Sequence, residues 1–86
     1  MSSEKVRADR LTLKAARVRL EMDQSDLAKA AGLTQTTVSD FELGKTKPHE
    51  STRAMIQAAL EARGIVFTNG DMPGFYFNKE KAIIPS

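Results

Sequence analysis

Apolar residues recur at helical spacing through most of the chain. Within residues 11–22, Leu13, Ala16 and Leu20 lie three or four positions apart, with charged residues between them. This spacing predicts an amphipathic helix with one apolar face. A second helix of this kind is predicted over residues 51–63, and the glycine that follows ends it. The residues of that helix expected to face the core are Met55, Ile56, Ala59 and Leu60.

Between these segments, the sequence predicts two shorter helices joined by a tight turn. Asp23 and Asp26 can cap the free amides of the first helix. Gly32 ends it, because glycine takes a left-handed turn without a side-chain clash. Thr34 can cap the second helix, over residues 35–43, which is also followed by a glycine. The residues expected to face the core are Leu27, Ala28, Ala31, Val38 and Phe41.

The pattern changes in the last part of the chain. Residues 65–67 and 75–77 are β-branched and aromatic runs. The segment 68–74 between them contains Asn-Gly, Gly-Asp and Pro-Gly pairs, which are typical of turns. We therefore expect two short strands that pair as a loose hairpin.

The aromatic rings of these strands form a large apolar surface for so small a domain. We expect a second copy of the chain to cover part of it, because strands paired across a two-fold axis would bury the rings and satisfy an open sheet edge. The alternative is a hairpin folded onto the chain's own helices. The candidate interface residues are Phe67, Phe75, Tyr76 and Phe77. In the tail that follows, Ile83 and Ile84 are candidates for docking on the rest of the domain.

Composition narrows the class of protein. With 86 residues, 41% hydrophobic and 28% charged, the chain is predicted to be one globular domain with a thin core. It has no apolar run of about 18–20 residues and no secretory signal, so we expect a cytoplasmic protein with no membrane partner. The lack of cysteine and the single histidine, His49, argue against thiolate and His-based sites. We therefore expect no enzyme activity, no cofactor and no metal site.

Positive charge is concentrated in two places, although the formal net charge is only +2. Before Met22, three acidic residues accompany six basic ones, namely Lys5, Arg7, Arg10, Lys14, Arg17 and Arg19. A second cluster contains Lys45, Lys47 and Arg53. Clusters of this kind suit an acidic partner, but on their own they are more often solvated faces.

The central segment, residues 23–45, resembles the helix-turn-helix of the Cro and lambda-type repressors, also called the xenobiotic response element family. The likeness depends on the cap at Asp23 and on Gly32 in the turn, together with the apolar residues around them, namely Leu27, Ala28, Leu33, Val38 and Phe41. It extends over about residues 11–64 and implies a mainly α fold, a compact four-helix lambda-repressor-like domain with the short β-strand pair or hairpin appended. On this basis we expect a flexible basic N-terminal arm (1–10), a DNA-binding domain (11–64) and a β extension for dimerisation (65–86).

The resemblance implies that the helix over residues 35–43 enters the major groove of DNA with its first turns at the base edges. The implied base-contacting residues are Gln35, Thr36, Thr37, Ser39 and Asp40. Gln35 is the first candidate, because its amide can both donate to and accept from adenine, and a threonine methyl can pack on that of thymine. The alternative is that these are ordinary polar residues of an exposed helix.

Phosphate contacts are implied for Gln24, Thr34, Lys45, Lys47 and Arg17. The two lysines would supply affinity that does not depend on sequence, unless they are simply solvated charges. Arg17 and Glu42 match an internal ion pair of the family scaffold, and Arg17 has enough N–H donors to bind phosphate as well. The basic arm would follow the DNA backbone or enter a minor groove, and the alternative is a frayed, solvated end.

The sequence departs from the family pattern in its recognition helix. This helix has no lysine or arginine, and Asp40 stands where many relatives carry a neutral or basic residue. Asp40 could accept from a cytosine amino group, exclude wrong contacts or orient a neighbour. Leu43 replaces an asparagine that is common before the glycine, so one polar backbone contact would be missing. Direct base contacts would then be few, and DNA shape would supply part of the specificity.

Together, these features predict a DNA-binding transcriptional regulator, either a repressor or an autoregulated switch. It would bind a near-palindromic operator in double-stranded DNA as a homodimer, with recognition helices about 34 Å apart. The alternative is a protein-interaction module, an antitoxin or antiactivator that binds another protein through the scaffold and the aromatic tail.

Overall fold

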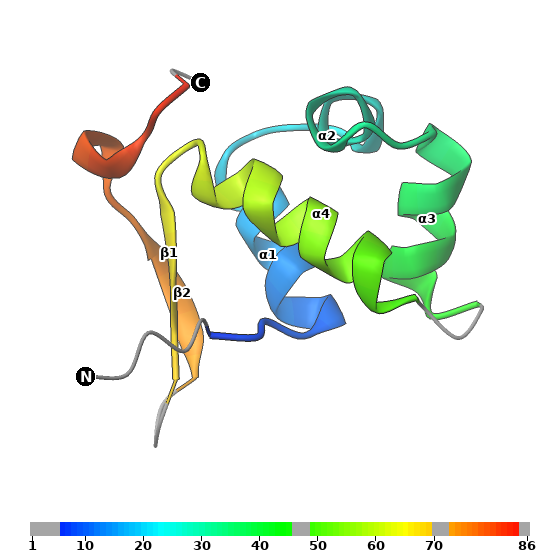
Figure 1. The fold of residues 1–86 in the computed structure, drawn as a ribbon, viewed down its shortest axis with the longest axis horizontal. Coiled ribbons are helices and arrows are strands. Elements are labelled where there is room, and N and C mark those ends of the chain that lie inside the picture. Colours follow the sequence, from blue (N-terminus) through cyan, green and yellow to red (C-terminus); the bar gives the residue numbers. More distant parts are fainter. Residues whose placement is uncertain (1–5, 46–48, 70–72, 85–86) are drawn as a thin grey trace.

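The computed structural model describes residues 6–45, 49–69 and 73–84 of the chain. In these ranges the predicted fold is confirmed, because four helices are followed by an antiparallel hairpin (Figure 1). The elements are α1 (Arg10–Arg19), α2 (Gln24–Ala31), α3 (Gln35–Leu43), α4 (Glu50–Glu61), β1 (Ile65–Thr68), β2 (Gly74–Phe77) and a final 3-10 turn, η1 (Lys79–Lys81). Helix α3 lies at one end of the molecule, and the hairpin lies at the other.

The turn between α2 and α3 forms where the sequence predicts it. The Asp23 carboxylate accepts from the Asp26 amide at 2.7 Å, and the Asp26 carboxylate accepts from the Asp23 amide at 3.1 Å. This capping box satisfies two free amides at the start of α2. At the other end Gly32 has a φ of 74°, and the Leu33 amide donates to the Ala28 carbonyl at 2.8 Å. This closing pattern leads the chain directly into α3.

Helix α1 is shorter than predicted. It begins at Arg10 and ends at Arg19, whereas the apolar spacing had suggested an end near Met22. Glu21 takes a left-handed conformation, with a φ of 60°, which breaks the helix and turns the chain toward α2. The apolar spacing continues beyond the helix because the turn also packs on the core.

Helix α4 differs from prediction in its bounds and in one core residue. It runs from Glu50 to Glu61, so it starts and ends slightly earlier than expected. Ile56 and Leu60 are fully buried, as predicted, but Met55 is 40% exposed. Neighbouring residues on a helix point about 100° apart, so Met55 lies beside the inward face instead of on it.

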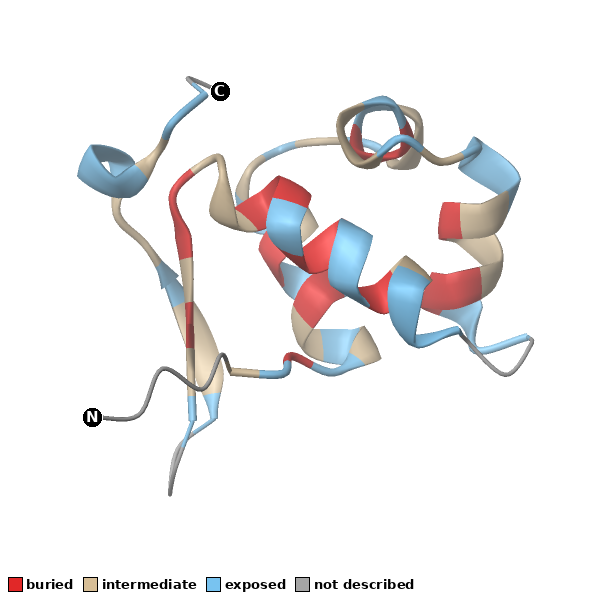
Figure 2. Ribbon diagram, viewed as in Figure 1, coloured by how far each residue is buried: buried red, intermediate tan, exposed pale blue. Residues whose placement is uncertain are grey.

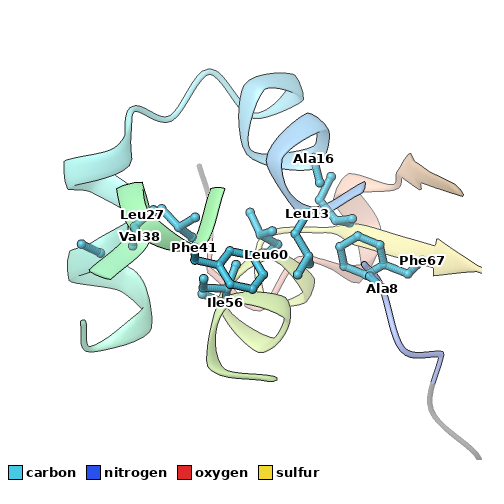
Figure 3. Close-up of a cluster of buried hydrophobic side chains, with 12 residues drawn as sticks. Ala8, Leu13, Ala16, Leu27, Val38, Phe41, Ile56, Leu60 and Phe67 are labelled. Carbon is cyan, nitrogen blue, oxygen red and sulfur yellow. The ribbon is translucent and has the colours of Figure 1, made fainter. Parts of the chain in front are cut away.

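The core lies between the helices and the inner face of the hairpin. Its largest fully buried side chains are Leu13, Leu27, Val38, Ile56, Leu60 and Ile65. Phe41 from α3 and Phe67 from β1 join the same cluster (Figure 3). Buried positions on each helix face inward, and exposed positions face outward (Figure 2). Ala31, predicted to face the core, is only half-buried.

The two strands pair within one chain, with Ile65 opposite Phe77 and Phe67 opposite Phe75. Strand β1 packs on α4, and β2 packs on α1. The Arg19 guanidinium lies 4.8 Å from the centre of the Phe77 ring, a distance at which a cation is attracted to the ring face. The hairpin is therefore folded onto the chain's own helices, which was the alternative to strands shared between copies.

After the hairpin, the chain returns to the end of α4. Gly64 has a φ of 100°, and a Cβ atom there would lie 2.8 Å from the Asn78 carbonyl oxygen, so this position requires glycine. The Ile83 and Ile84 amides both donate to the Ala62 carbonyl, at 2.8 and 2.9 Å. The tail therefore docks through its backbone, while the Ile83 side chain stays 84% exposed.

The segment predicted as a free arm is attached to the domain over residues 6–9. Ala8 is buried, and its amide donates to Gln57 Oε1 at 3.0 Å. Gln57 Nε2 in turn donates to the Val6 carbonyl. Arg10 is not part of an arm, because it is the first residue of α1. Lys5 lies outside the described residues.

Two arginines strengthen this attachment through Glu50. Arg7 donates to the Glu50 carboxylate at 2.9 Å, and Arg53 donates to the same carboxylate and to the Ala8 carbonyl. Hydrogen bonds from Arg53 and Arg7 lower the pKa of Glu50 to about 2. Arg53 is itself buried, so the prediction that it belongs to an exposed basic cluster with Lys45 is wrong.

Candidate nucleic-acid interface

Helix α3 presents a polar face to solvent and an apolar face to the core. Among the predicted base-contacting residues, Gln35 and Thr36 are exposed, while Thr37, Ser39 and Asp40 are half-buried. On the opposite face Val38 and Phe41 are buried. The core therefore holds one side of α3 in place and leaves its first turn open to solvent.

A pair of threonines fixes the start of α3. Thr34 Oγ1 accepts from the Thr37 amide at 3.2 Å, and the two side-chain hydroxyl oxygens lie 2.9 Å apart. When Thr37 donates in this pair, the hydroxyl hydrogen of Thr34 is free to meet an anion at the helix N-terminus. Thr37 is thus part of the cap, while Thr34 is exposed and able to reach a phosphate.

Glu42, buried near the end of α3, links this helix to α1 and α2. Arg17 donates to both carboxylate oxygens, through Nε at 2.7 Å and Nη2 at 2.9 Å, and Gln24 Nε2 donates to one of them at 3.0 Å. Burial alone would raise the pKa of Glu42, but the hydrogen bonds from Arg17 and Gln24 outweigh it and lower the pKa. A two-pronged contact of this kind fixes direction as well as distance, so it orients α3.

These internal contacts change what Gln24 and Arg17 can offer to DNA. Gln24, predicted to contact phosphate, uses one amide N–H on Glu42 and retains a second. Arg17 also donates Nη1 to the Met22 carbonyl at 2.7 Å, so three of its donor nitrogens are engaged inside the fold. In the structure, Gln24 and Arg17 both make contacts that hold the helices of the fold together.

Lys45 lies two residues beyond the end of α3 and is exposed. Its Nζ lies 3.9 Å from Asp40 Oδ1, so the acid that departs from the family pattern faces a predicted phosphate-binding residue. An exposed ion pair of this length is weak, which leaves Lys45 free to turn toward a phosphate. The other predicted loop contact, Lys47, lies outside the described residues.

Comparison with protein-family models matches residues 13–64, from within α1 to just beyond α4, to a helix-turn-helix family. This is the Cro/C1-type family, also known as the xenobiotic response element family. The chain belongs to this helix-turn-helix family. The resemblance predicted from the sequence is therefore confirmed, and with it the class of DNA-binding transcription regulators. No curated protein matches the chain.

Arg10 belongs to the surroundings of the helix-turn-helix, although the sequence placed it in a flexible arm. Its Nη1 donates to the Glu42 carbonyl oxygen at 2.7 Å. Arg10 and Arg17 are seven residues apart, which is two helical turns, so both lie on the same face of α1. The sequence could have predicted this role of Arg10 from two features. Arg10 stands seven positions before Arg17, and the last turn of α3 has no basic residue of its own.

Most of the aromatic residues predicted to form a dimer interface pack in the core of their own chain. Phe67 is buried in the core (Figure 3). Phe75 and Phe77 are partly buried against the same core. Phe67 is therefore covered by its own chain, and the role of the aromatic residues between copies stays a prediction. Tyr76, on the outward side of β2, remains 50% exposed.

The described ranges of this helix-turn-helix protein hold neither a cluster suited to a metal ion nor a helix suited to a membrane. Among residues 6–45, 49–69 and 73–84, no group of three or more His, Asp or Glu side chains is placed to hold a metal ion. Within the same ranges, each helix is too short or too polar to cross a membrane.

Proposed function

We propose that this helix-turn-helix protein is a transcriptional repressor or autoregulated switch that binds a near-palindromic DNA operator as a homodimer in the cytoplasm. The observation that carries the proposal is the open polar face of α3, led by Gln35 and Thr36, on a helix whose other face is fixed in the core. A rigid helix with a polar leading edge suits the major groove of B-DNA, which is about 12 Å wide.

Base readout is assigned to the exposed side of α3. Gln35 is the first residue of the helix, and its amide is suited to adenine, while Thr36 can offer a methyl group to thymine. Ser39 lies one turn after Gln35 on the same side, followed by Asp40. Thr37 takes part through the cap, with its methyl group as a further apolar contact.

The proposed phosphate contacts surround α3. Thr34 and Gln24 stand at the N-terminal ends of α3 and α2, where unpaired backbone amides favour an anion. Lys45 stands beyond the other end of α3. Arg17 contributes least directly, because its donors are engaged within the fold. The role of Lys47 stays a prediction from the sequence.

Reading both halves of a near-palindrome requires two copies with recognition helices about 34 Å apart. Support for a homodimer comes from the outward side of the hairpin, where Tyr76 is half-exposed. In the described part of the chain β2 pairs with β1 along one edge, so its other edge suits a further strand. We assign dimerisation to residues 65–86 through Tyr76 and this edge of β2, with residues 11–64 as the DNA-binding domain.

The test uses a DNA duplex that the wild-type chain selects from a randomised pool. We expect Gln35→Ala to weaken binding of this duplex by about 1–3 kcal/mol and to relax the preference at one base position. Lys45→Ala should weaken binding of every duplex alike and reduce the salt slope by about 0.9, because it removes one phosphate contact. Binding is measured by titration at several salt concentrations.

Lys29→Ala is the matched control, because Lys29 is an exposed lysine of α2 that is not assigned to DNA. It should leave both affinity and salt slope nearly unchanged. Equal, sequence-independent losses for Gln35→Ala and Lys45→Ala would contradict the assigned roles. A saturated complex with one protein per selected duplex would contradict the dimer.

Asp40→Asn is expected to raise the affinity for unselected DNA about two- to fivefold at low salt. The substitution removes a negative charge beside the proposed phosphate contacts and releases Lys45 from its ion pair. The gain should fade at high salt, where exposed charges are screened. Titration of a scrambled duplex at two salt concentrations measures it, and unchanged affinity at low salt would show that Asp40 does not limit non-specific binding.

A protein partner is the second candidate, as in an antitoxin or antiactivator. It is favoured by the exposed side chains of Tyr76 and Ile83, which belong to the end of the chain that lies away from α3 (Figure 1). A protein bound there would leave α3 open to DNA, so the two functions are compatible. A toxin gene beside this one would support the antitoxin, and a divergent promoter with an inverted repeat would support the regulator.

A further inference from the structure

The C-terminal end of α3 is closed by its own backbone at two carbonyl groups. Gly44, with a φ of 68°, donates its amide to the Phe41 carbonyl at 3.2 Å, and Lys45 donates to the Asp40 carbonyl at 3.1 Å. This is the usual closing pattern of a helix that ends in a left-handed glycine. The carbonyl of Glu42 is not reached by this pattern and needs another donor.

Arg10 supplies that donor from a different helix. Its Nη1 lies 2.7 Å from the Glu42 carbonyl oxygen, and it brings a positive charge to the negative end of the α3 dipole. Helix α3 has no basic residue in its own last turn, and the side chain of Leu43 is apolar and 61% exposed. The charge that stabilises this helix end therefore comes from the first residue of α1.

Gly44 is shaped to receive this arginine. A Cβ atom on Gly44 would lie 3.3 Å from both Cζ and Nε of Arg10, so the absence of a side chain lets the guanidinium lie against the backbone. Glu42 is consequently held twice from α1, at its carbonyl by Arg10 and at its carboxylate by Arg17. The two contacts restrict both the position and the rotation of the end of α3.

We infer that Arg10 is a positioning residue for DNA recognition, an inference that rests on the proposed function. It caps α3, the recognition helix, and fixes the backbone of Gly44 and Lys45. Lys45 is one of the proposed phosphate contacts. Without Arg10, the last turn of α3 frays, so the base-reading side chains no longer meet the groove in a single orientation. Loss of Arg10 therefore reduces the difference in affinity between selected and unselected DNA.

The test compares wild type with Arg10→Ala, Arg10→Lys and the control Arg19→Ala, which removes the same charge from the other end of α1. Each is titrated with the duplex selected by the wild type and with a scrambled duplex, at several salt concentrations. Arg10→Ala should bind the selected duplex about tenfold more weakly, the order expected for one charge-assisted hydrogen bond. Binding of the scrambled duplex and the salt slope should change little, and Arg10→Lys should recover part of the loss.

Amide hydrogen exchange of the free protein gives a second readout that does not involve DNA. In Arg10→Ala the amides of Gly44 and Lys45 should exchange at least about tenfold faster, while those of α2 keep their wild-type rates. Faster exchange throughout the domain would mean general unfolding and would overturn the inference. Wild-type rates at Gly44 and Lys45 would overturn it as well.

The binding outcomes separate this inference from the proposed function. A wild-type chain that enriches no sequence from the pool overturns both. A selective wild type together with a fully selective Arg10→Ala overturns only the role of Arg10. Equal weakening of both duplexes, with the salt slope lowered by about 0.9, would show that Arg10 is itself a phosphate ligand and not a positioning residue.

Discussion

Arg17→Met is expected to destabilise the fold by about 3–5 kcal/mol, because it leaves the Glu42 carboxylate buried without its cation. The side chains of Arg17 and Glu42 are only 11% and 2% exposed. Methionine keeps much of the apolar length of arginine, so the loss reports on charge and hydrogen bonding more than on a cavity. Denaturant unfolding at pH 7, followed by far-ultraviolet circular dichroism, measures the change in the free energy of unfolding.

The matched control removes both charges at once. The double variant Arg17→Met, Glu42→Leu should recover most of the lost stability, because an apolar pair that fills the same space carries no uncompensated charge. Gln24 loses its acceptor in this variant, but it is half-buried and can turn to water. If the double variant is as unstable as Arg17→Met, the cost lies in packing or in the bond from Arg17 to the Met22 carbonyl, and the prediction is wrong.

The pH dependence of stability gives this pair a separate signature. In the wild type the pKa of Glu42 is lowered from 4.5, so its contribution is complete above that value and is lost as the pH falls through the folded pKa. In Arg17→Met the arginine no longer offsets burial, so the carboxylate is easier to protonate. The stability difference between the two proteins should therefore narrow as the pH falls below 4.5.

The helix-turn-helix was predictable because its signals are local. The caps at Asp23 and Thr34 and the left-handed turn at Gly32 each depend on hydrogen bonds between residues a few positions apart. These signals place α2 and α3 within a residue or two. The exposed first turn of α3 follows from the same reasoning, because Val38 and Phe41 fix which face is buried.

The arginines were not predictable in the same way, because a charge in a sequence does not show whether it faces solvent or a distant partner. Arg7 and Arg53 meet at Glu50, and Arg10 reaches the end of α3. Arg7 and Arg10 had been placed in an arm along the DNA, and Arg53 in a basic cluster suited to an acidic partner. Their partners lie more than 30 positions away in the sequence, apart from Glu50 and Gln57, which contact Arg53 within α4.

The hairpin shows the same limit for apolar residues. The strands and their turn follow from local pattern, but whether Phe67 meets another copy or its own helices depends on where α4 and the N-terminal segment lie. In the structure Phe67 packs in the same cluster as Ala8, which lies almost 60 positions earlier in the chain (Figure 3). The sequence did not show that the N-terminal segment is attached to the domain, and buried Gln57 is one of the residues that attach it.

Gln57→Leu is expected to cost about 2–4 kcal/mol, although it exchanges two neutral side chains of similar size. Gln57 is buried, and its Oε1 accepts from the Ala8 amide at 3.0 Å and from Arg53, while its Nε2 donates to the Val6 carbonyl. Leucine makes none of these bonds, and each buried polar group left without a partner costs about 1–3 kcal/mol. The groups nearest the surface can bond to water instead, so the total loss of stability stays below the sum of these costs. Denaturant unfolding measures the loss.

Gln35→Leu is the matched control, because it makes the same substitution at an exposed position and should change stability by no more than about 0.5 kcal/mol. Hydrogen exchange at the Ala8 amide should be slow in the wild type, where this amide is buried and bonded to Gln57, and fast in Gln57→Leu. A variant that keeps this amide protected and its stability within about 0.5 kcal/mol would contradict the prediction. Arg10 lies in α1, which Leu13 anchors in the core, so exchange at Gly44 should keep its wild-type rate even when residues 6–9 are released.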